Sequence, residues 1–364
     1  MLSWLKFAVR HLAWQGIWHK GMAPTSVERS KAFMALQTVG IIGGGAWGTA
    51  LGVSGRRAGR DVILWAYEPE TIAEINEQHR NSLYLPGVSL DPAIEATTQF
   101  NEVASCDFLL MVTPAQHVRA IAAELRPYMR KDQPLVIGSK GIEQATGQLL
   151  SEVIAEVLPQ VRPAVLSGPS FAAEIARGLP AALTLATASE AQGRALSHAL
   201  SHASFRCYWS DDVAGAEIGG ALKNVYAIAA GIVVGKKLGA SAHAALVTRA
   251  FAEMMRFGAA LAARRETLIG LSGLGDLVLT CGSPQSRNMS LGIALGEGRG
   301  LGEVLKARLS VTEGIYTASA VVEMAAARGI EIPIAQAVHA VVSGLATVDE
   351  AIEALLARPL RPER

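Results

Sequence analysis

Cysteine is scarce in this 364-residue chain, which holds only Cys106, Cys207 and Cys281. They lie far apart, and none belongs to a CxxC pair or to a cysteine and histidine cluster with metal-ligand spacing. The pattern argues against a disulfide framework and against a metal site, so we expect no metal. A reduced, cytoplasmic setting is the default expectation.

An excess of charge and a long apolar run are lacking too. Lys and Arg number 33 against 32 Asp and Glu, a formal net charge of +1. Nucleic-acid-binding proteins normally show a basic excess or a basic stripe, so we expect a small-molecule partner and no nucleic acid. No stretch reaches the roughly 18 uncharged residues of a transmembrane helix. The run from Val225 to Val234 has the length of a buried helix.

The N-terminal segment, residues 1–37, stands apart from the rest. It has no acidic residue from Met1 to Val27, while Lys6, Arg10 and several tryptophans would suit a basic amphipathic helix. Three interpretations stay open: membrane contact through residues 1–33, a targeting peptide, or an incidental or disordered extension ahead of a usual start at Met34. We exclude this segment from the fold prediction.

The remaining chain predicts two domains. Half of all residues are hydrophobic, and roughly 150 residues per domain is the usual prior. From Thr38 short apolar runs alternate with helical patterns, which predicts a doubly wound, Rossmann-type α/β domain over residues 38–210 with a parallel sheet. Expected strands are 39–42, 61–65, 108–112, 135–138, 164–166 and 182–186, with crossover helices over 116–129 and 146–157. Beyond Asp211 only helical periodicity remains, which predicts an all-α C-terminal domain over residues 211–358.

A glycine loop follows the first predicted strand. Gly43, Gly45 and Gly48 have the GxGxxG spacing, and a helix is expected from there to about Arg57. Such glycines permit a tight turn and a close backbone approach to a pyrophosphate at the helix N-terminus, so the loop predicts a bound dinucleotide.

The choice between NAD and NADP stays open in the sequence. An acidic residue about 20 positions after the loop would hold a ribose 2′-hydroxyl, and an arginine would favour a 2′-phosphate. The second strand ends Trp65-Ala66-Tyr67-Glu68 without an arginine. Glu68 either accepts from the ribose or is a solvated residue ahead of Pro69.

Lys223 interrupts a helix that is otherwise small or apolar on most faces. Burial of a lysine is costly and lowers its pKa toward the range useful for general acid-base chemistry. The alternative is a lysine that extends to the surface at a helix start.

Three other segments carry candidate groups. Lys140 follows a buried strand at the carboxyl edge of the sheet, where open α/β sheets bind ligands, although an exposed loop lysine is the alternative. Asp276 either orients a lysine ammonium or caps the next helix. The segment Gln285 to Asn288 combines Arg287 with hydroxyl and amide neighbours at a helix start, which suits a phosphate monoester.

Taken in order, these motifs resemble the NAD(P)-dependent glycerol-3-phosphate dehydrogenase family of bacterial type over residues 38 to 356. The matching segments are Gly43 to Ala50, Asn81 to Pro86, Ser139 to Gly141, Ser167 to Ser170, Leu222 to Asn224, Ala244 to Arg249, Gly273 to Leu277, Gln285 to Asn288, and Glu313 with Gly314. The resemblance implies reversible reduction of dihydroxyacetone phosphate to sn-glycerol 3-phosphate with NADH or NADPH, which supplies glycerol 3-phosphate for phospholipid synthesis.

The resemblance also implies roles for individual residues. Lys223 would be the catalytic proton donor and acceptor. The implied substrate-binding residues are Lys140, Gly168, Ser170, Lys223, Asp276, Ser286, Arg287 and Asn288. The implied cofactor-binding residues are Gly43, Gly45, Ala46, Trp47, Gly48, Tyr67, Lys140, Ala172, Arg287, Val311 and Glu313. The oligomeric state stays open, with a homodimer as one alternative.

Some residues differ from the family pattern, and two other functions remain as alternatives. Met289-Ser290 stands where bacterial members often have more arginine, and Ser241 and His243 stand where asparagine and a basic residue are common. His243 and His117 are expected in helix-capping or surface roles. The rivals are a reductase acting on a carboxylate substrate and a non-catalytic dinucleotide sensor.

Overall fold

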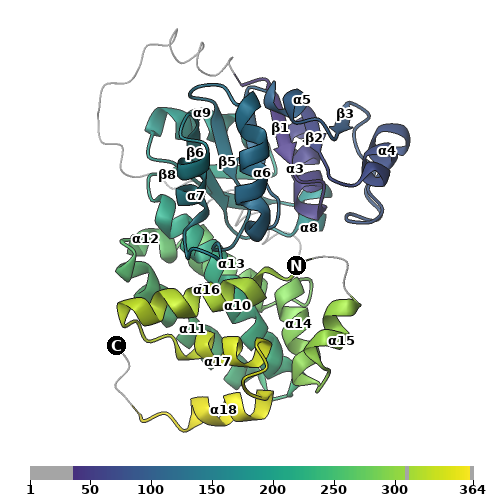
Figure 1. Ribbon diagram of the computed structural model, residues 1–364. Coiled ribbons are helices and arrows are strands. Elements are labelled where there is room, and N and C mark those ends of the chain that lie inside the picture. The colour runs from purple at the N-terminus through teal and green to yellow at the C-terminus, as the bar shows by residue number, and fades with distance from the viewer. Residues whose placement is uncertain (1–35, 308–310, 361–364) are drawn as a thin grey trace, which may run out of the picture. The chain divides into compact units, whose positions relative to one another are not determined.

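The computed structural model describes residues 36–307 and 311–360, and the elements are labelled in Figure 1. The predictions for residues 1–35, Met34 among them, fall outside this range. Within these residues eight strands form a single sheet with the order β3-β2-β1-β4-β5-β6-β7-β8. The strands are β1 (Thr38–Ile42), β2 (Asp61–Trp65), β3 (Ile94–Thr97), β4 (Phe108–Met111), β5 (Pro134–Ile137), β6 (Arg162–Ser167), β7 (Ala181–Ala186) and β8 (Phe205–Ser210).

The sheet differs from the prediction in two respects. It is mixed rather than parallel, because β7 runs antiparallel to β6 while β8 is parallel to β7. In addition, β3 and β8 were not predicted. Both are edge strands, and each carries exposed or half-buried residues that shorten its apolar run.

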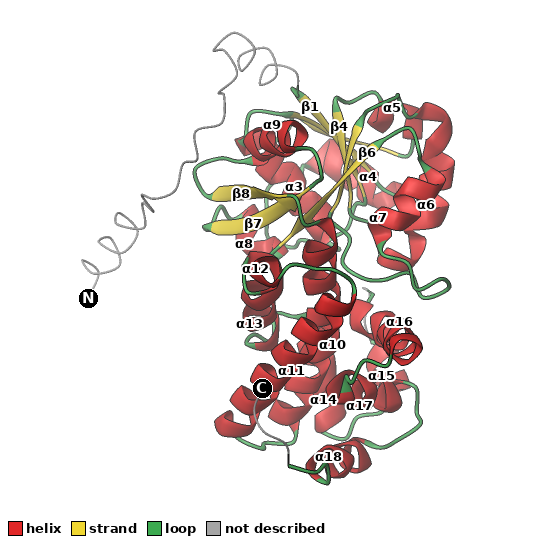
Figure 2. Ribbon diagram, turned by 90° about the vertical axis from the view of Figure 1, so that its left-hand side faces the viewer, coloured by secondary structure: helices red, strands yellow, loops and turns green. Residues whose placement is uncertain are grey.

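Helices cover both faces of the sheet (Figure 2). Successive residues of a central strand point to opposite faces, so Ile41 packs in one apolar core and Ile42 in the other. The covering helices are α3 (Ala46–Arg57), α4 (Pro69–Gln78), α5 (Phe100–Ala104), α6 (Val118–Leu125), α7 (Leu150–Val157), α8 (Ala172–Ala176) and α9 (Glu190–Leu200), with short 3₁₀ turns η1 (Ala115–His117) and η2 (Arg126–Tyr128). This arrangement confirms the doubly wound fold class, although α7 begins four residues later than expected.

The remaining described elements are all helical, as predicted. They are α10 (Val213–Gly235), α11 (Ala240–Ala260), α12 (Arg265–Leu268), the π-helical turn η3 (Leu271–Gly275), α13 (Asp276–Cys281), α14 (Arg287–Gly296), α15 (Leu301–Lys306), α16 (Glu313–Arg328), α17 (Pro333–Val342) and α18 (Val348–Leu356). Asp212, two residues after β8, joins two of these segments, since its side chain accepts from the Gly215 amide at 2.9 Å and from the Arg264 amide at 2.8 Å.

The long helix α10 forms the core of the helical domain. Among the described helices it alone is long and apolar enough to cross a membrane, yet 89% of its apolar window is buried by the fold. Glycines bring α14 close against it: a Cβ at Gly231 would lie 2.1 Å from the Met289 carbonyl oxygen, and one at Gly292 would lie 2.0 Å from that of Ile228. The close crossing fixes the start of α14 relative to the middle of α10.

Candidate active site

The glycine loop occupies the turn between β1 and α3, as predicted. Gly43 has a φ of +132°, in a region that L side chains rarely adopt, and a Cβ at Gly48 would lie 1.9 Å from the Gly43 carbonyl oxygen. At Gly45 a Cβ would meet nothing within 4 Å. Gly43 and Gly48 therefore allow the turn itself, while the Gly45 backbone borders open space.

Asn81 secures this loop from a distant segment. Its side-chain amide is buried and donates to the Gly44 carbonyl oxygen and to Thr49 Oγ1, both at 2.8 Å. Asn81, the first residue of the motif Asn81 to Pro86, therefore stabilises the glycine loop, although it lies more than 30 residues away in the sequence.

The N-terminus of α3 fits the pyrophosphate of a dinucleotide. Its cap, Gly45, offers no side-chain hydrogen bond, and the first turn holds no acidic residue. The first amides of a helix lack intrahelical partners and favour an anion. Nearby, the indole nitrogen of Trp47 is buried without a hydrogen-bond partner. The backbone amides at the start of α3 and the Trp47 indole are hydrogen-bond donors without partners. Oxygens of a bound phosphate or amide group could accept from them.

Tyr67 and Glu68 follow β2. Tyr67 is 80% exposed, so its ring is accessible to a ligand. Glu68 is not simply a solvated residue, because one carboxylate oxygen accepts from the Tyr84 hydroxyl at 2.9 Å.

The chemical centre is a buried carboxylate shared by two lysines, Lys223 from the middle of α10 and Lys140 from the loop after β5. Lys223 Nζ lies 2.7 Å from Asp276 Oδ1, and Lys140 Nζ lies 2.7 Å from Asp276 Oδ2. The exposed side-chain fractions are 9% for Lys223, 15% for Lys140 and 0% for Asp276. Three segments that are distant in sequence thus place three charges in one small volume.

These contacts decide between the two interpretations that the sequence left open for each of the three residues. Lys223 lies ten residues inside α10 and is buried, so it does not extend to the surface from a helix start. Lys140 is not an exposed loop lysine, since it also donates to the Gly168 carbonyl oxygen at 3.0 Å. Asp276 begins α13 but makes no cap there, and its interpretation as an N-cap is wrong.

Burial shapes the titration of this centre. The pKa of Lys223 falls to about 8, because burial and the charge of Lys140 lower it more than Asp276 raises it. Burial alone would raise the pKa of Asp276, but the two ammonium groups outweigh it and the pKa lies below its usual range. The site therefore holds an ionised carboxylate beside a lysine whose pKa is lowered to about 8.

Thr280 belongs to the same cluster and was not identified in the sequence. Its hydroxyl accepts from Lys223 Nζ at 3.0 Å and donates to Asp276 Oδ1 at 3.1 Å. Residues four apart share one helix face, so the spacing from Asp276 was the available signal.

The segment around Gly168 borders the lysines. Gly168 has a φ of +149°, and a Cβ there would lie 2.9 Å from Leu183 Cα, so no larger residue fits. The Ser170 hydroxyl donates to the Gly168 carbonyl oxygen at 3.1 Å. The next helix, α8, starts two residues later, at Ala172.

The start of α14 presents Arg287 between two residues that fix the helix. The Ser286 hydroxyl caps α14 by accepting from the Met289 amide at 3.2 Å. The Asn288 side chain donates to Asn224 Oδ1 at 2.9 Å and accepts from the Gly314 amide at 3.0 Å. Arg287 itself is exposed. The cap and the Asn288 bridge thus hold in place the turn that displays it.

Glu313 at the start of α16 links the helices to the sheet domain. Its Oε1 accepts from the Ala115 amide at 3.0 Å, and its Oε2 is buried without a hydrogen-bond partner. Burial raises the pKa of Glu313 to about 6, although the Ala115 amide and the charge of Arg287 lower it. An unsatisfied buried oxygen fits a ligand that donates a hydrogen bond.

The other predicted cofactor residues come from three further segments of the chain. Tyr67 follows β2, Ala172 begins α8, and Val311 comes two residues before α16. Among the described residues, no hydrogen bond or ion pair joins them to Lys223 or Lys140.

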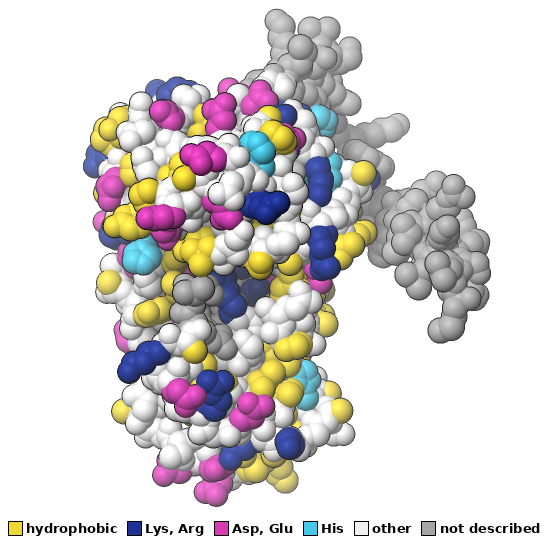
Figure 3. All heavy atoms as spheres, turned by 90° about the vertical axis from the view of Figure 1, so that its right-hand side faces the viewer, with side chains coloured by type: hydrophobic (Ala, Val, Ile, Leu, Met, Phe, Trp, Pro, Cys, Tyr) yellow, Lys and Arg dark blue, Asp and Glu magenta, His cyan; other side chains and the backbone are white. Residues whose placement is uncertain are grey.

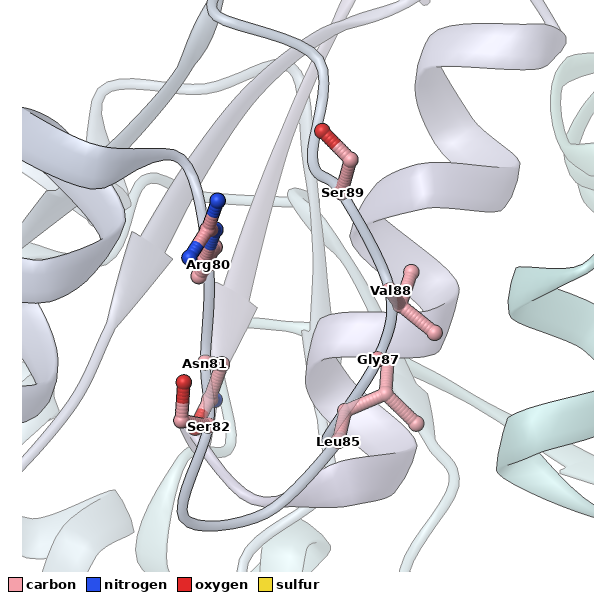
Figure 4. A pocket seen from close by; sticks show the side chains of 7 residues that line it. All are labelled: Arg80, Asn81, Ser82, Leu85, Gly87, Val88 and Ser89. Carbon is pink, nitrogen blue, oxygen red and sulfur yellow. The ribbon is translucent and has the colours of Figure 1, made fainter.

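The surface has a hollow with basic side chains and, at a different place, a cavity formed by residues 80–89. Figure 3 shows basic side chains in a hollow between the sheet domain and the helices below it. A cavity of about 300 Å³ lies elsewhere, between the two arms of segment 80–89 (Figure 4). It is lined by Arg80, Asn81, Ser82, Leu85, Gly87, Val88 and Ser89. It contains none of the charged groups of the lysine centre.

Two sequence models match nearly the whole described chain. They describe the N-terminus and the C-terminus of NAD-dependent glycerol-3-phosphate dehydrogenase and match residues 38–193 and 212–353. This chain belongs to that family.

Individual members of the family are similar along almost their entire length. The glycerol-3-phosphate dehydrogenase [NAD(P)+] of Parvibaculum lavamentivorans is 57% identical over 91% of this chain and 99% of its own, and that of Maricaulis maris is 54% identical over 90% and 98%. The crystal structure of glycerol-3-phosphate dehydrogenase from Coxiella burnetii is 37% identical, with a TM-score of 0.85 over 88% of this chain and 99% of its own.

His243 and His117 were expected in helix-capping or surface roles, and the structure agrees. His243, in the first turn of α11, lies with Nε2 2.9 Å from the Cys281 carbonyl oxygen at the end of α13. His117 is exposed at the end of η1. His243 therefore supports the helix that carries Asp276 and Thr280.

Proposed function

We propose that this chain interconverts dihydroxyacetone phosphate and sn-glycerol 3-phosphate with NADH or NADPH, and that it supplies glycerol 3-phosphate for phospholipid synthesis. The observation that carries the proposal is the buried Lys223, paired with Asp276 beside a second lysine in a member of this family. A positive, partly desolvated centre is suited to a carbonyl oxygen that becomes an alkoxide.

The dinucleotide, when bound, supplies a hydride to the substrate C2 or accepts one from it. In the reduction Lys223 donates a proton to the C2 oxygen, and in the oxidation it removes that proton. Asp276 orients Lys223, and Lys140 adds a second positive charge beside the developing oxyanion. The transfer then balances as one hydride and one proton added to a ketone.

The substrate phosphate is assigned to the start of α14. Arg287 is exposed there at a helix N-terminus, which favours an anion. The Ser286 hydroxyl accepts from Met289 and still has its own proton to donate, and the Asn288 amide uses one of its two protons on Asn224. Gly168, which accepts from Lys140, and Ser170, which donates to Gly168, complete the proposed substrate site.

The cofactor is assigned to the glycine loop and to groups around the cleft. Gly43, Gly45, Ala46, Trp47 and Gly48 would hold the pyrophosphate, and the unpaired Trp47 nitrogen supports this assignment. The unpaired Glu313 oxygen instead suits a part of the cofactor that donates a hydrogen bond. The remaining proposed cofactor residues are Tyr67, Lys140, Ala172, Arg287 and Val311.

Substrate profiling tests the proposal. Oxidation of NADH and of NADPH is followed with dihydroxyacetone phosphate and with ketopantoate as acceptors. We expect turnover with the phosphate substrate only. Turnover with ketopantoate alone would favour a carboxylate-reducing enzyme, and dinucleotide binding without any turnover would favour a sensor.

We also propose that the enzyme is cytoplasmic and forms a homodimer. The three cysteines are buried and free, which suits a reducing compartment, and closed dimers are the commonest oligomers of soluble proteins. Light scattering on the full-length protein tests the dimer. Sedimentation with anionic vesicles, compared between the full-length and Met34-start proteins, tests membrane contact through residues 1–33.

A further inference from the structure

Lys140 lies in the loop after β5, beside the turn that follows β4. Strands β4 and β5 are parallel neighbours, so both segments leave the sheet at the same edge. Residues 138–149 form the lysine loop, and residues 112–117 form the adjacent turn. The two segments touch next to Lys140, where the Ser139 hydroxyl donates to the Thr113 carbonyl oxygen at 2.5 Å.

Gln116, in the adjacent turn, holds the lysine loop with both ends of its side-chain amide. Its Nε2 donates to the Ile142 carbonyl oxygen at 2.9 Å, and its Oε1 accepts from the Gln144 amide at 2.9 Å. A side-chain amide carries both a donor and an acceptor, so one residue makes both bonds. The backbone is thus fixed two and four residues beyond Lys140.

An ion pair anchors the residue between these two contacts. The Arg119 guanidinium of α6 donates to both carboxylate oxygens of Glu143, at 2.9 and 3.0 Å. The Glu143 side chain is buried, and the hydrogen bonds from Arg119 hold its pKa below the usual range against the effect of burial. Arg119 also pairs with Glu156 of α7. The lysine loop is therefore fastened to its neighbours through residues 142 to 144.

The Lys140 side chain needs this support because it is long and its charge is repelled. Its ammonium shares the Asp276 carboxylate with Lys223, and like charges repel. The four-carbon stem of a lysine is flexible, so the ammonium keeps one position only where the backbone is fixed. The Lys140 carbonyl oxygen accepts from Asn224 at a long 3.4 Å. Further along the loop, in the described part of the chain, the next hydrogen bond to another segment comes from Gln116.

We propose that Gln116 is a positioning residue for Lys140: its two hydrogen bonds to the lysine loop hold the Lys140 ammonium beside Lys223, where both charges act on the substrate oxygen. This inference rests on the proposed function, because it concerns how the same site is held together. A shift of about 1 Å in such a centre can cost about 100-fold in rate. Gln116 acts through Lys140 and takes no part in the proton transfer.

Steady-state reduction of dihydroxyacetone phosphate tests the proposal. Gln116→Met keeps the length of the side chain and removes both hydrogen bonds, so kcat/KM should fall by about 10- to 100-fold. Gln116→Asn keeps the amide on a shorter stem and should show a smaller loss, and it replaces the methionine variant if that protein does not fold.

The control is Gln144→Met. It replaces an exposed side chain of the same loop and keeps the backbone amide that Gln116 binds. Because exposed substitutions have small effects, kcat/KM should stay within about twofold of the wild-type value.

A double-mutant cycle with Lys140→Met separates positioning from a general structural role. Removal of the Lys140 ammonium should lower kcat/KM by about 10²- to 10³-fold, the value of one preorganised donor to an oxyanion. In that background Gln116→Met should cost less than about twofold more, because the group that it positions is absent. A loss of the same size with and without Lys140 would overturn the proposal.

The pH profile gives a second readout. Burial and the charge of Lys140 lower the pKa of Lys223, while Asp276 raises it. When Lys140 moves away, the inflection of kcat/KM for reduction should therefore move to higher pH in Gln116→Met, and further in Lys140→Met. An inflection that rises in Lys140→Met but not in Gln116→Met would contradict a displacement of Lys140.

Chemical labelling reports the position of Lys140 without substrate. Reductive methylation with formaldehyde and cyanoborohydride, followed by peptide mass spectrometry, compares Lys140 with the exposed Lys131 ahead of the same strand. Lys140 should react at least about threefold faster in Gln116→Met than in the wild type, the lower value of one hydrogen bond. An unchanged labelling rate would refute the inference alone. A wild-type protein that does not reduce dihydroxyacetone phosphate would refute the proposed function, and faster labelling would still support the role of Gln116.

Discussion

Asp276 holds Lys223 with one carboxylate oxygen and Lys140 with the other, each at 2.7 Å, and the carboxylate is fully buried. One anion against two cations leaves the centre with a net positive charge. Because Lys223 and Lys140 come from different segments of the chain, Asp276 also fixes their separation. The first two predictions follow from this arrangement.

Replacement of Lys223 by methionine should abolish turnover. The variant loses the proposed proton donor, and general acid-base catalysis typically contributes a factor of about 10² to 10⁴, so we expect kcat to fall by about 10²- to 10⁴-fold. Dinucleotide affinity should change little. Stopped-flow absorbance of NADH measures the rate, with Lys237→Met, an exposed lysine just beyond α10, as control. Undiminished reduction would refute the assigned role.

The pH dependence should have opposite signs in the two directions. Burial lowers the pKa of Lys223 to about 8. Reduction needs the protonated amine, so its rate should fall as pH rises through about 8, whereas oxidation should accelerate over the same interval. Asp276→Asn removes the anion that favours the ammonium form, and both inflections should move to lower pH. Profiles of kcat/KM that keep their inflections in this variant would assign the titration to another group.

Substitution of Arg287 should act on the substrate phosphate. Loss of charge-assisted hydrogen bonds to a phosphate corresponds to roughly 100-fold in kcat/KM, so Arg287→Met should lose about that much with dihydroxyacetone phosphate. Dihydroxyacetone has no phosphate, and its slow reduction should change less than about threefold. The control is Arg299→Met, which removes an arginine paired with Glu303 on the surface. Equal losses with both substrates would mean that Arg287 serves another purpose.

Glu217 should make stability fall as the pH rises from about 4.5 to about 7. This buried residue of α10 accepts from the Ser151 amide at 2.8 Å and also from its hydroxyl. Burial raises the pKa to about 7 from the usual 4.5, against these hydrogen bonds. A raised pKa in the folded state gives stability that is full below about pH 4.5 and is lost as pH rises through about 7.

Melting curves between pH 5 and 8 test this effect. Glu217→Gln cannot ionise and can still accept from the Ser151 amide, so its melting temperature should decline less than that of the wild type. Buried Glu253 and Glu313, whose pKa values burial raises to about 7 and about 6, supply the decline that remains. The exposed substitution Glu77→Gln should follow the wild type. An unchanged slope in Glu217→Gln would show that Glu217 is ionised in the fold throughout this range.

Local features of the fold were predictable, and pairing at the sheet edges was not. β1, the glycine loop and α3 depend on apolar residues and glycines within 20 positions, so their pattern is visible in the sequence. β3 and β8 pair on one side only, and their mixed burial weakens the apolar run. The antiparallel direction of β7 depends on where the chain returns to the sheet, which no local pattern encodes.

The sequence by itself determined the glycine loop and the cost of a lysine inside an apolar helix, since conformational freedom and desolvation are properties of single residues in their local segment. Only the tertiary structure decided what compensates that lysine. Asp276 lies 53 residues from Lys223 and 136 from Lys140, and ion pairs act over a few ångströms regardless of sequence separation. The same holds for Glu68, whose charge was readable in the sequence but whose orientation depends on Tyr84, a residue brought to it by the fold.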